Sequence, residues 1–86
     1  MVPMQKSLHS DAYQRLLALL RVARKDAGVS QAELASRLGT TQTFVSKCER
    51  GERRLDVIEL RTWCRALGVS TTDLLTALEH EGGLHR

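Results

Sequence analysis

The apolar residues of this chain recur at intervals of three and four positions, which is the spacing of one face of an α-helix. The first such stretch spans residues 10–27, with Ser10 as its expected N-cap and Gly28 as its stop. Its predicted buried stripe consists of Tyr13, Leu16, Leu17, Leu20, Ala23 and Ala27. The pattern therefore begins with one long amphipathic helix.

Two shorter helices are predicted next, joined by a tight turn. Ser30 can cap the first of them, and Glu33 stands three residues on, as in a capping box. Gly39 marks its end, because glycine enters the left-handed conformation without steric cost. Thr41 can cap the second. The apolar positions of the pair are Leu34, Ala35 and Leu38, then Val45 and Cys48.

The remaining chain predicts a fourth and a fifth helix. Asp56 is the expected cap of the fourth, with Glu59 as its box partner, and Gly68 ends it. Its stripe is Val57, Leu60, Cys64 and Leu67, with Ile58 and Trp63 beside it. Ser70 opens the fifth, whose apolar face is Leu74, Leu75 and Leu78 and which Gly82 and Gly83 close. We expect a compact all-α domain of five helices over residues 10–80, with tails at 1–9 and 81–86.

The outward face of the third predicted helix has a distinctive chemistry. It carries hydrogen-bond donors and acceptors and positive charge, and none of its members is a carboxylate. These residues are Gln42, Thr43, Ser46, Lys47 and Arg50.

The segment Gln31–Arg50 resembles the helix-turn-helix of the lambdoid phage repressor and Cro group, the Xre family. The matching positions are Leu34, Ala35, Leu38, Gly39, Val45 and Cys48. The flanks G-V-S-Q and S-K-x-E-x-G-E-R-R-L-D agree as well, so the resemblance extends over residues 10–78. It implies a lambda-repressor-like fold, with the helix-turn-helix at helices two and three, and binding to double-stranded DNA.

The resemblance implies that the third helix enters the major groove and reads bases with Gln42, Thr43, Ser46 and Lys47. A glutamine amide can pair with adenine N6 and N7, and a lysine can donate to guanine O6 and N7. A threonine offers its hydroxyl, or its methyl group to a thymine. The alternative interpretation is an ordinary solvated helix face, which leaves the lack of carboxylates unexplained.

Phosphate contacts are expected around that helix. Gln31 resembles the phosphate-clamping glutamine of the family, and backbone N–H groups at the same helix N-terminus favour an anion. The other expected phosphate ligands are Thr41, Arg50, Arg53 and Arg54. For Arg53 and Arg54 the alternative is an ion pair with Glu49, Glu52 or Asp56.

Three further side chains receive assignments. Arg24 and Glu49 match a family pair, and we expect a partly buried structural ion pair between them. Phe44 has two interpretations: contact with a thymine methyl or sugar, or cover for the loop near Leu55. Trp63 is predicted to lie in the core.

Composition narrows the function. The net charge is +3, but residues 1–54 hold ten Lys or Arg against five Asp or Glu, whereas residues 55–86 hold three against five. An excess of basic residues in positions 1–54 favours binding to a polyanion. The two cysteines and three histidines show no metal-ligand spacing, so neither a metal nor a cofactor is expected. The longest apolar run has only five residues, which excludes a membrane segment.

These observations predict a cytoplasmic, non-enzymatic, sequence-specific regulator, with repression as the default. One recognition helix reads only a few base pairs, so we expect a homodimer on a palindromic operator. Leu74, Leu75 and Leu78 are the expected dimer contact, unless they pack onto the first helix. The alternatives are an antitoxin with a toxin partner, the controller of a restriction–modification operon, and a protein-interaction module that reads no bases.

Overall fold

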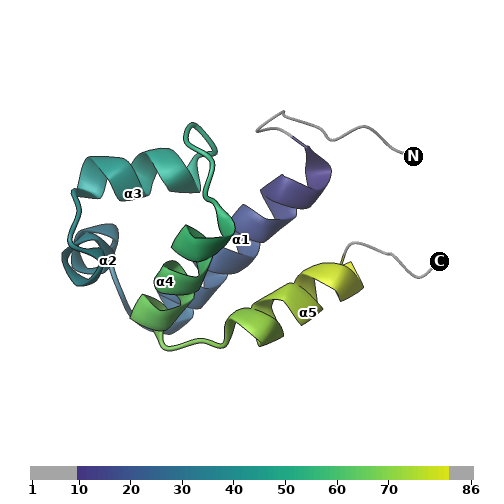
Figure 1. Ribbon diagram of the computed structural model, residues 1–86. Coiled ribbons are helices and arrows are strands. Elements are labelled where there is room, and N and C mark those ends of the chain that lie inside the picture. The colour runs from purple at the N-terminus through teal and green to yellow at the C-terminus, as the bar shows by residue number, and fades with distance from the viewer. Residues whose placement is uncertain (1–9, 82–86) are drawn as a thin grey trace.

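A computed structural model describes residues 10–81 of the chain as five helices (Figure 1). In chain order they are α1 (Asp11–Asp26), α2 (Gln31–Leu38), α3 (Gln42–Glu49), α4 (Val57–Leu67) and α5 (Thr71–Glu81). No strand occurs among the described residues. The predicted all-α fold is therefore confirmed, whereas the calls on residues 1–9 and 82–86 lie outside the described residues.

Each helix begins where the sequence predicts, because a short polar side chain closes its first turn. In every case the side chain accepts a hydrogen bond from the backbone N–H three residues further on, at 2.7–3.2 Å. The five capping residues are Ser10, Ser30, Thr41, Asp56 and Ser70.

The two predicted capping boxes have different outcomes. At α4 the box is complete, because the Glu59 carboxylate also accepts from the Asp56 backbone N–H at 2.9 Å. At α2 only the hydrogen bond to Ser30 is formed. The Glu33 carboxylate instead accepts from Arg37 Nε, one turn further along the exposed face, at 3.3 Å.

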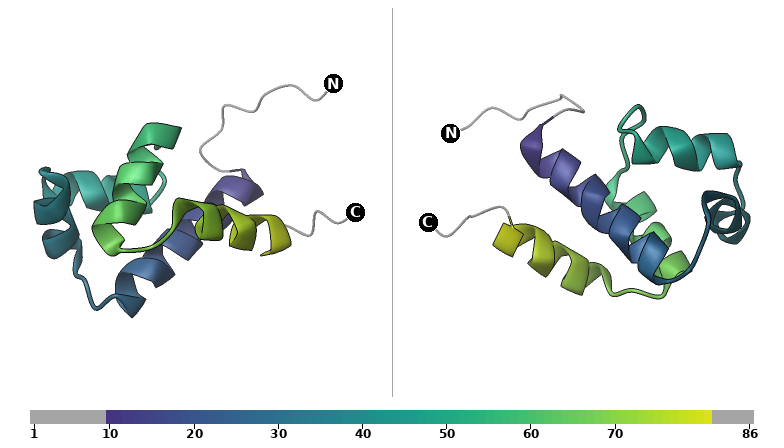
Figure 2. Two further views of the ribbon diagram at one scale, coloured as in Figure 1. Left: turned by 60° about the horizontal axis from the view of Figure 1, so that its bottom comes forward. Right: turned by 180° about the vertical axis from the view of Figure 1, so that it is seen from behind.

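The core lies where four helices meet around α4. Trp63 of α4, Leu20 of α1, Leu34 of α2 and Val45 of α3 are all almost completely buried. Thus Trp63 is a core residue, as predicted. α2 and α3 form one end of the molecule, and α5 runs along α1 at the other end (Figures 1 and 2). This arrangement leaves one side of α3 uncovered.

Three apolar residues that the pattern placed on or beside buried stripes are exposed instead. Ala27 follows the last residue of α1 and serves as its C-cap. Val57 and Ile58 are 72% and 61% exposed. They lie in the first turn of α4, which no other helix covers, and Ile58 lines an open hollow there. The buried stripe of α4 therefore starts one turn later, at Leu60.

Candidate nucleic-acid interface

The turn between α2 and α3 brings the two helices close together. Gly39 has a φ of 72°, the left-handed conformation that ends α2, and the Thr40 N–H returns to the Ala35 carbonyl at 2.9 Å. Ala35 is 3% exposed and Val45 is fully buried. The small side chain of Ala35 and the anchor at Val45 hold α3 against α2 on its inner face.

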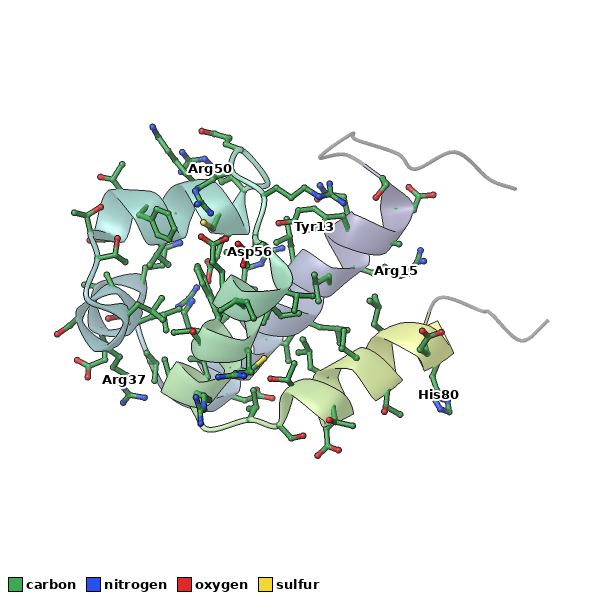
Figure 3. The ribbon with its side chains drawn as sticks, in the orientation of Figure 1. Tyr13, Arg15, Arg37, Arg50, Asp56 and His80 are labelled. Atoms are coloured by element: carbon green, nitrogen blue, oxygen red, sulfur yellow. The ribbon has the colours of Figure 1, made fainter. Side chains whose placement is uncertain are left out.

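The outer face of α3 carries the predicted base-reading residues. Gln42, Thr43 and Lys47 are exposed and Ser46 is half-buried. A shallow polar hollow of about 280 Å³ lies on this face. It is lined by Gln42, Thr43 and Ser46, together with Arg50. In Figure 1, α3 lies at one edge of the molecule, and Figure 3 shows Arg50 at the C-terminal end of that helix.

A buried ion pair fixes the inner side of the same helix end. Arg24 Nε donates to Glu49 Oε2 at 2.7 Å and Arg24 Nη2 donates to Glu49 Oε1 at 3.2 Å. The two side chains are 10% and 5% exposed. A further donor of Arg24 satisfies the Val29 carbonyl at 2.9 Å. The pair thus joins α1 to α3, and Arg24 also holds the connection that leads into α2.

The ion pair extends toward the recognition face through two glutamines. Gln31 Nε2 donates to Glu49 Oε1 at 2.9 Å, and Gln42 Nε2 lies 3.5 Å from Gln31 Oε1. The charge-assisted contact with Glu49 holds the Gln31 amide in one orientation. The sequence assigned Gln31, Gln42 and Glu49 separately, and their connection depends on the packing of α1, α2 and α3.

Arg50 turns to the opposite side of the helix from Glu49. Its Nε donates to Glu52 Oε2 at 2.7 Å, and its Nη1 donates to Ser46 Oγ. Both members of the ion pair are about half exposed. The hydrogen bond with Arg50 lowers the pKa of the Glu52 carboxyl and raises the pKa of Arg50, so both groups carry their charges at neutral pH.

Arg53 pairs with a carboxylate that the sequence did not suggest. Its guanidinium donates to both oxygens of Glu59, at 3.0 and 2.8 Å, rather than to Glu49, Glu52 or Asp56. The guanidinium also lies 4.8 Å from the centre of the Phe44 ring. Arg53 lies in the loop between α3 and α4, and Glu59 lies in the first turn of α4. The path of the loop therefore brings the Arg53 guanidinium to the Glu59 carboxylate.

Arg54 and Tyr13 anchor that loop to α1. The Arg54 guanidinium lies 4.4 Å from the centre of the Tyr13 ring. The Leu55 backbone N–H donates to the Tyr13 hydroxyl at 3.0 Å. Tyr13 is 5% exposed and was predicted only as part of a buried stripe. The hydroxyl is the one feature in the sequence that could have indicated a polar partner for this core residue.

Phe44 lies beside the loop. It is half-buried and lines the hollow of about 240 Å³ together with Leu38, Leu55, Ile58 and Trp63. Of its two interpretations, cover for the loop near Leu55 fits this placement.

The predicted dimer contact on α5 is divided by the packing. Leu74 is 8% exposed and belongs to the core of the same chain, so it does not lie open to a partner. Leu75 is 39% exposed and Leu78 is half-buried. Leu74 is therefore buried by the packing of α5 onto α1 and α4, as the alternative interpretation of these leucines expected.

Other kinds of site find no support in residues 10–81. That range holds no cluster of metal-ligating side chains, and none of its helices is long and apolar enough to cross a membrane. Cys48 and Cys64 are free thiols in the core, where burial raises their pKa and keeps them protonated.

A tight helical turn, a closely held second helix and an exposed carboxylate-free face define a helix-turn-helix DNA-binding domain. The chain belongs to the helix-turn-helix family, in its Xre branch: a family model described as helix-turn-helix matches residues 20–74. The predicted family is thus confirmed.

Individual relatives agree with this membership. The chain is 42% identical over 53 residues to y4dJ of Sinorhizobium fredii (strain NBRC 101917 / NGR234), named an uncharacterized HTH-type transcriptional regulator; the match covers 62% of this chain and 69% of y4dJ. An XRE-family like protein from Pseudomonas syringae pv. tomato str. DC3000 superposes with a TM-score of 0.81 at 53% identity, over 88% of this chain and 95% of that one. A mutant of the restriction–modification controller protein C.Esp1396I superposes with a TM-score of 0.77 at 26% identity, over 90% and 98%.

Proposed function

We propose that this helix-turn-helix regulator is a repressor that binds a palindromic operator as a homodimer. The observation that carries the proposal is the outer face of α3, where Gln42 stands exposed and its amide lies against Gln31. Gln31 is itself held by the buried Glu49. A side chain that is already oriented loses less conformational entropy when it pairs with a base.

Two sets of residues would have two different roles in DNA binding. Gln42, Thr43, Ser46 and Lys47 read base edges, and Gln31, Thr41 and Arg54 contact phosphates on either side of the groove. Arg53 is left out of this set, because the two terminal nitrogens that would hold a phosphate, Nη1 and Nη2, both donate to Glu59. Basic residues concentrated in the first 54 positions supply the general attraction to DNA.

Dimerisation is assigned to the outer side of α5. Leu75 and the exposed part of Leu78 would meet the same surface of a second copy, because a two-fold operator calls for an isologous contact. Leu75→Glu, placed on an exposed position, should shift sedimentation toward the monomer and weaken operator binding without unfolding the chain. Unchanged sedimentation would remove α5 from the dimer contact.

The controller of a restriction–modification operon is a second candidate. Its specific support is the likeness to C.Esp1396I, which covers nearly the whole of both chains. Both candidates require the same base-reading face, and they differ in the genes that the operator regulates.

Selection from a random duplex library at near-physiological salt tests the proposal. An enriched inverted repeat is the expected result, and Gln42→Ala should then relax the preference at one base position per half-site, by roughly tenfold. Binding of Gln42→Ala to unrelated DNA should stay near the wild-type level. Equal losses on all sequences would assign Gln42 a role other than base reading.

A further inference from the structure

We propose that Arg50 is a further base-reading residue, directed at a guanine, and that Glu52 positions it. The inference rests on the proposed function, since it extends the same recognition face. The sequence had placed Arg50 among the phosphate contacts, and its surroundings favour the different role.

Arg50 lies on the same helix face as two predicted base readers. Gln42, Ser46 and Arg50 stand four residues apart and so follow one another along a single face. Side chains on a helix lean toward its N-terminus, and that direction carries the Arg50 guanidinium back over the preceding turn. The hydrogen bond to Ser46 shows that the guanidinium lies there, alongside the predicted base readers.

The shape of the surface also groups Arg50 with the predicted base readers. Arg50 lines the same polar hollow as Gln42, Thr43 and Ser46. A residue that only clamps the backbone belongs outside this hollow, as Thr41 does at the N-cap of α3 and Arg54 does in the loop against Tyr13. The Arg50 guanidinium instead borders the hollow that three of the predicted base readers line.

Only some of the hydrogen-bond donors of Arg50 are occupied within the described residues. Glu52 takes the Nε hydrogen, along one side of the planar guanidinium, at 2.7 Å. Ser46 takes one hydrogen of Nη1. Among residues 10–81, the hydrogens of Nη2 and the second hydrogen of Nη1 meet no acceptor, and they form the terminal fork that matches O6 and N7 of guanine. Glu52 thus fixes the plane of the fork and leaves its reading edge open.

The test compares library selections for the wild type, Arg50→Lys, Glu52→Gln and the matched control Arg65→Lys. Lysine keeps the charge and loses the fork. We expect the wild-type half-site to contain a guanine whose preference falls roughly tenfold or more in Arg50→Lys. Preferences elsewhere in the site and the dependence of affinity on salt should stay unchanged, and Arg65→Lys, on the exposed side of α4, should select the wild-type site.

The positioning role of Glu52 has its own readout. Glu52→Gln should weaken the preference at that same guanine, by less than Arg50→Lys does, while its melting temperature matches the wild type. A change in stability alone would mark Glu52 as merely structural and overturn that part of the proposal. If Arg50→Lys keeps the full guanine preference, or if Arg50→Ala lowers affinity equally for all sequences and flattens the salt dependence by about one unit, Arg50 is a phosphate contact. If the wild type enriches no motif at all, the proposed function fails, and this inference with it.

Discussion

Glu49 and Arg50 are neighbours in the sequence, yet they end up in opposite environments at the end of α3. The Glu49 side chain is 5% exposed and forms an ion pair with Arg24 in the interior. The Arg50 side chain is 53% exposed and pairs with Glu52 at the surface. The two ion pairs have the same shortest N–O distance, 2.7 Å. The distance alone therefore does not tell how much each pair contributes to the free energy of unfolding.

The difference lies in the solvent. Breaking a buried pair leaves one charge without water, whereas water readily replaces either partner of an exposed pair. The inner pair is thus suited to hold α1, α2 and α3 in place. The outer pair contributes little to holding the helices together. One turn of helix carries both a structural element and an adaptable one.

The largest expected effect tests this contrast directly. Glu49→Ala removes one partner of the buried pair, strands Arg24, and should destabilise the fold by about 3–5 kcal/mol. Glu52→Ala, the matched change at the exposed pair, should leave the unfolding curve close to that of the wild type. Urea unfolding followed by circular dichroism measures both. Similar losses for the two variants would abolish the distinction between inner and outer pairs.

A smaller effect is expected where the interior anchors the outer loop. Tyr13→Phe removes the hydroxyl that accepts from the Leu55 N–H and leaves that buried donor unsatisfied, at a cost of about 1–3 kcal/mol. The ring remains, so the core keeps its volume. Hydrogen exchange should show a less protected Leu55 amide. A fully protected amide in the variant would mean that the loop is held by other contacts.

The smallest effect concerns pH and the exposed Glu59. Hydrogen bonds from Arg53 and from the Asp56 backbone lower the pKa of Glu59 below its ordinary value of 4.5. A carboxyl with a lowered folded-state pKa contributes stability above the unfolded-state pKa and loses it as the pH falls through the folded-state value. The wild type should therefore exceed Glu59→Gln in melting temperature at pH 6 and lose that advantage below pH 4.5. An advantage that does not shrink as the pH falls below 4.5 would contradict this linkage.

Local chemistry made much of the fold predictable from the sequence. The helix starts depend on a single polar side chain within three residues, and the ends of α2 and α4 depend on one glycine each. The prediction of buried residues from periodicity was wrong at helix ends, where Ala27 and Val57 are exposed. Periodicity describes a helix face but does not tell how far a neighbouring element covers it.

The sequence by itself determined the five-helix order, the helix-turn-helix and the outward direction of its polar face, because these depend on spacings of three and four residues. Only the tertiary structure decided the partners of the charged groups. Arg53 meets Glu59 across a loop, Tyr13 meets the Leu55 N–H 42 positions away, and Gln31 meets Glu49 between two helices. Such contacts are set by how helices cross, and the chain encodes that crossing only through the packing of the whole core.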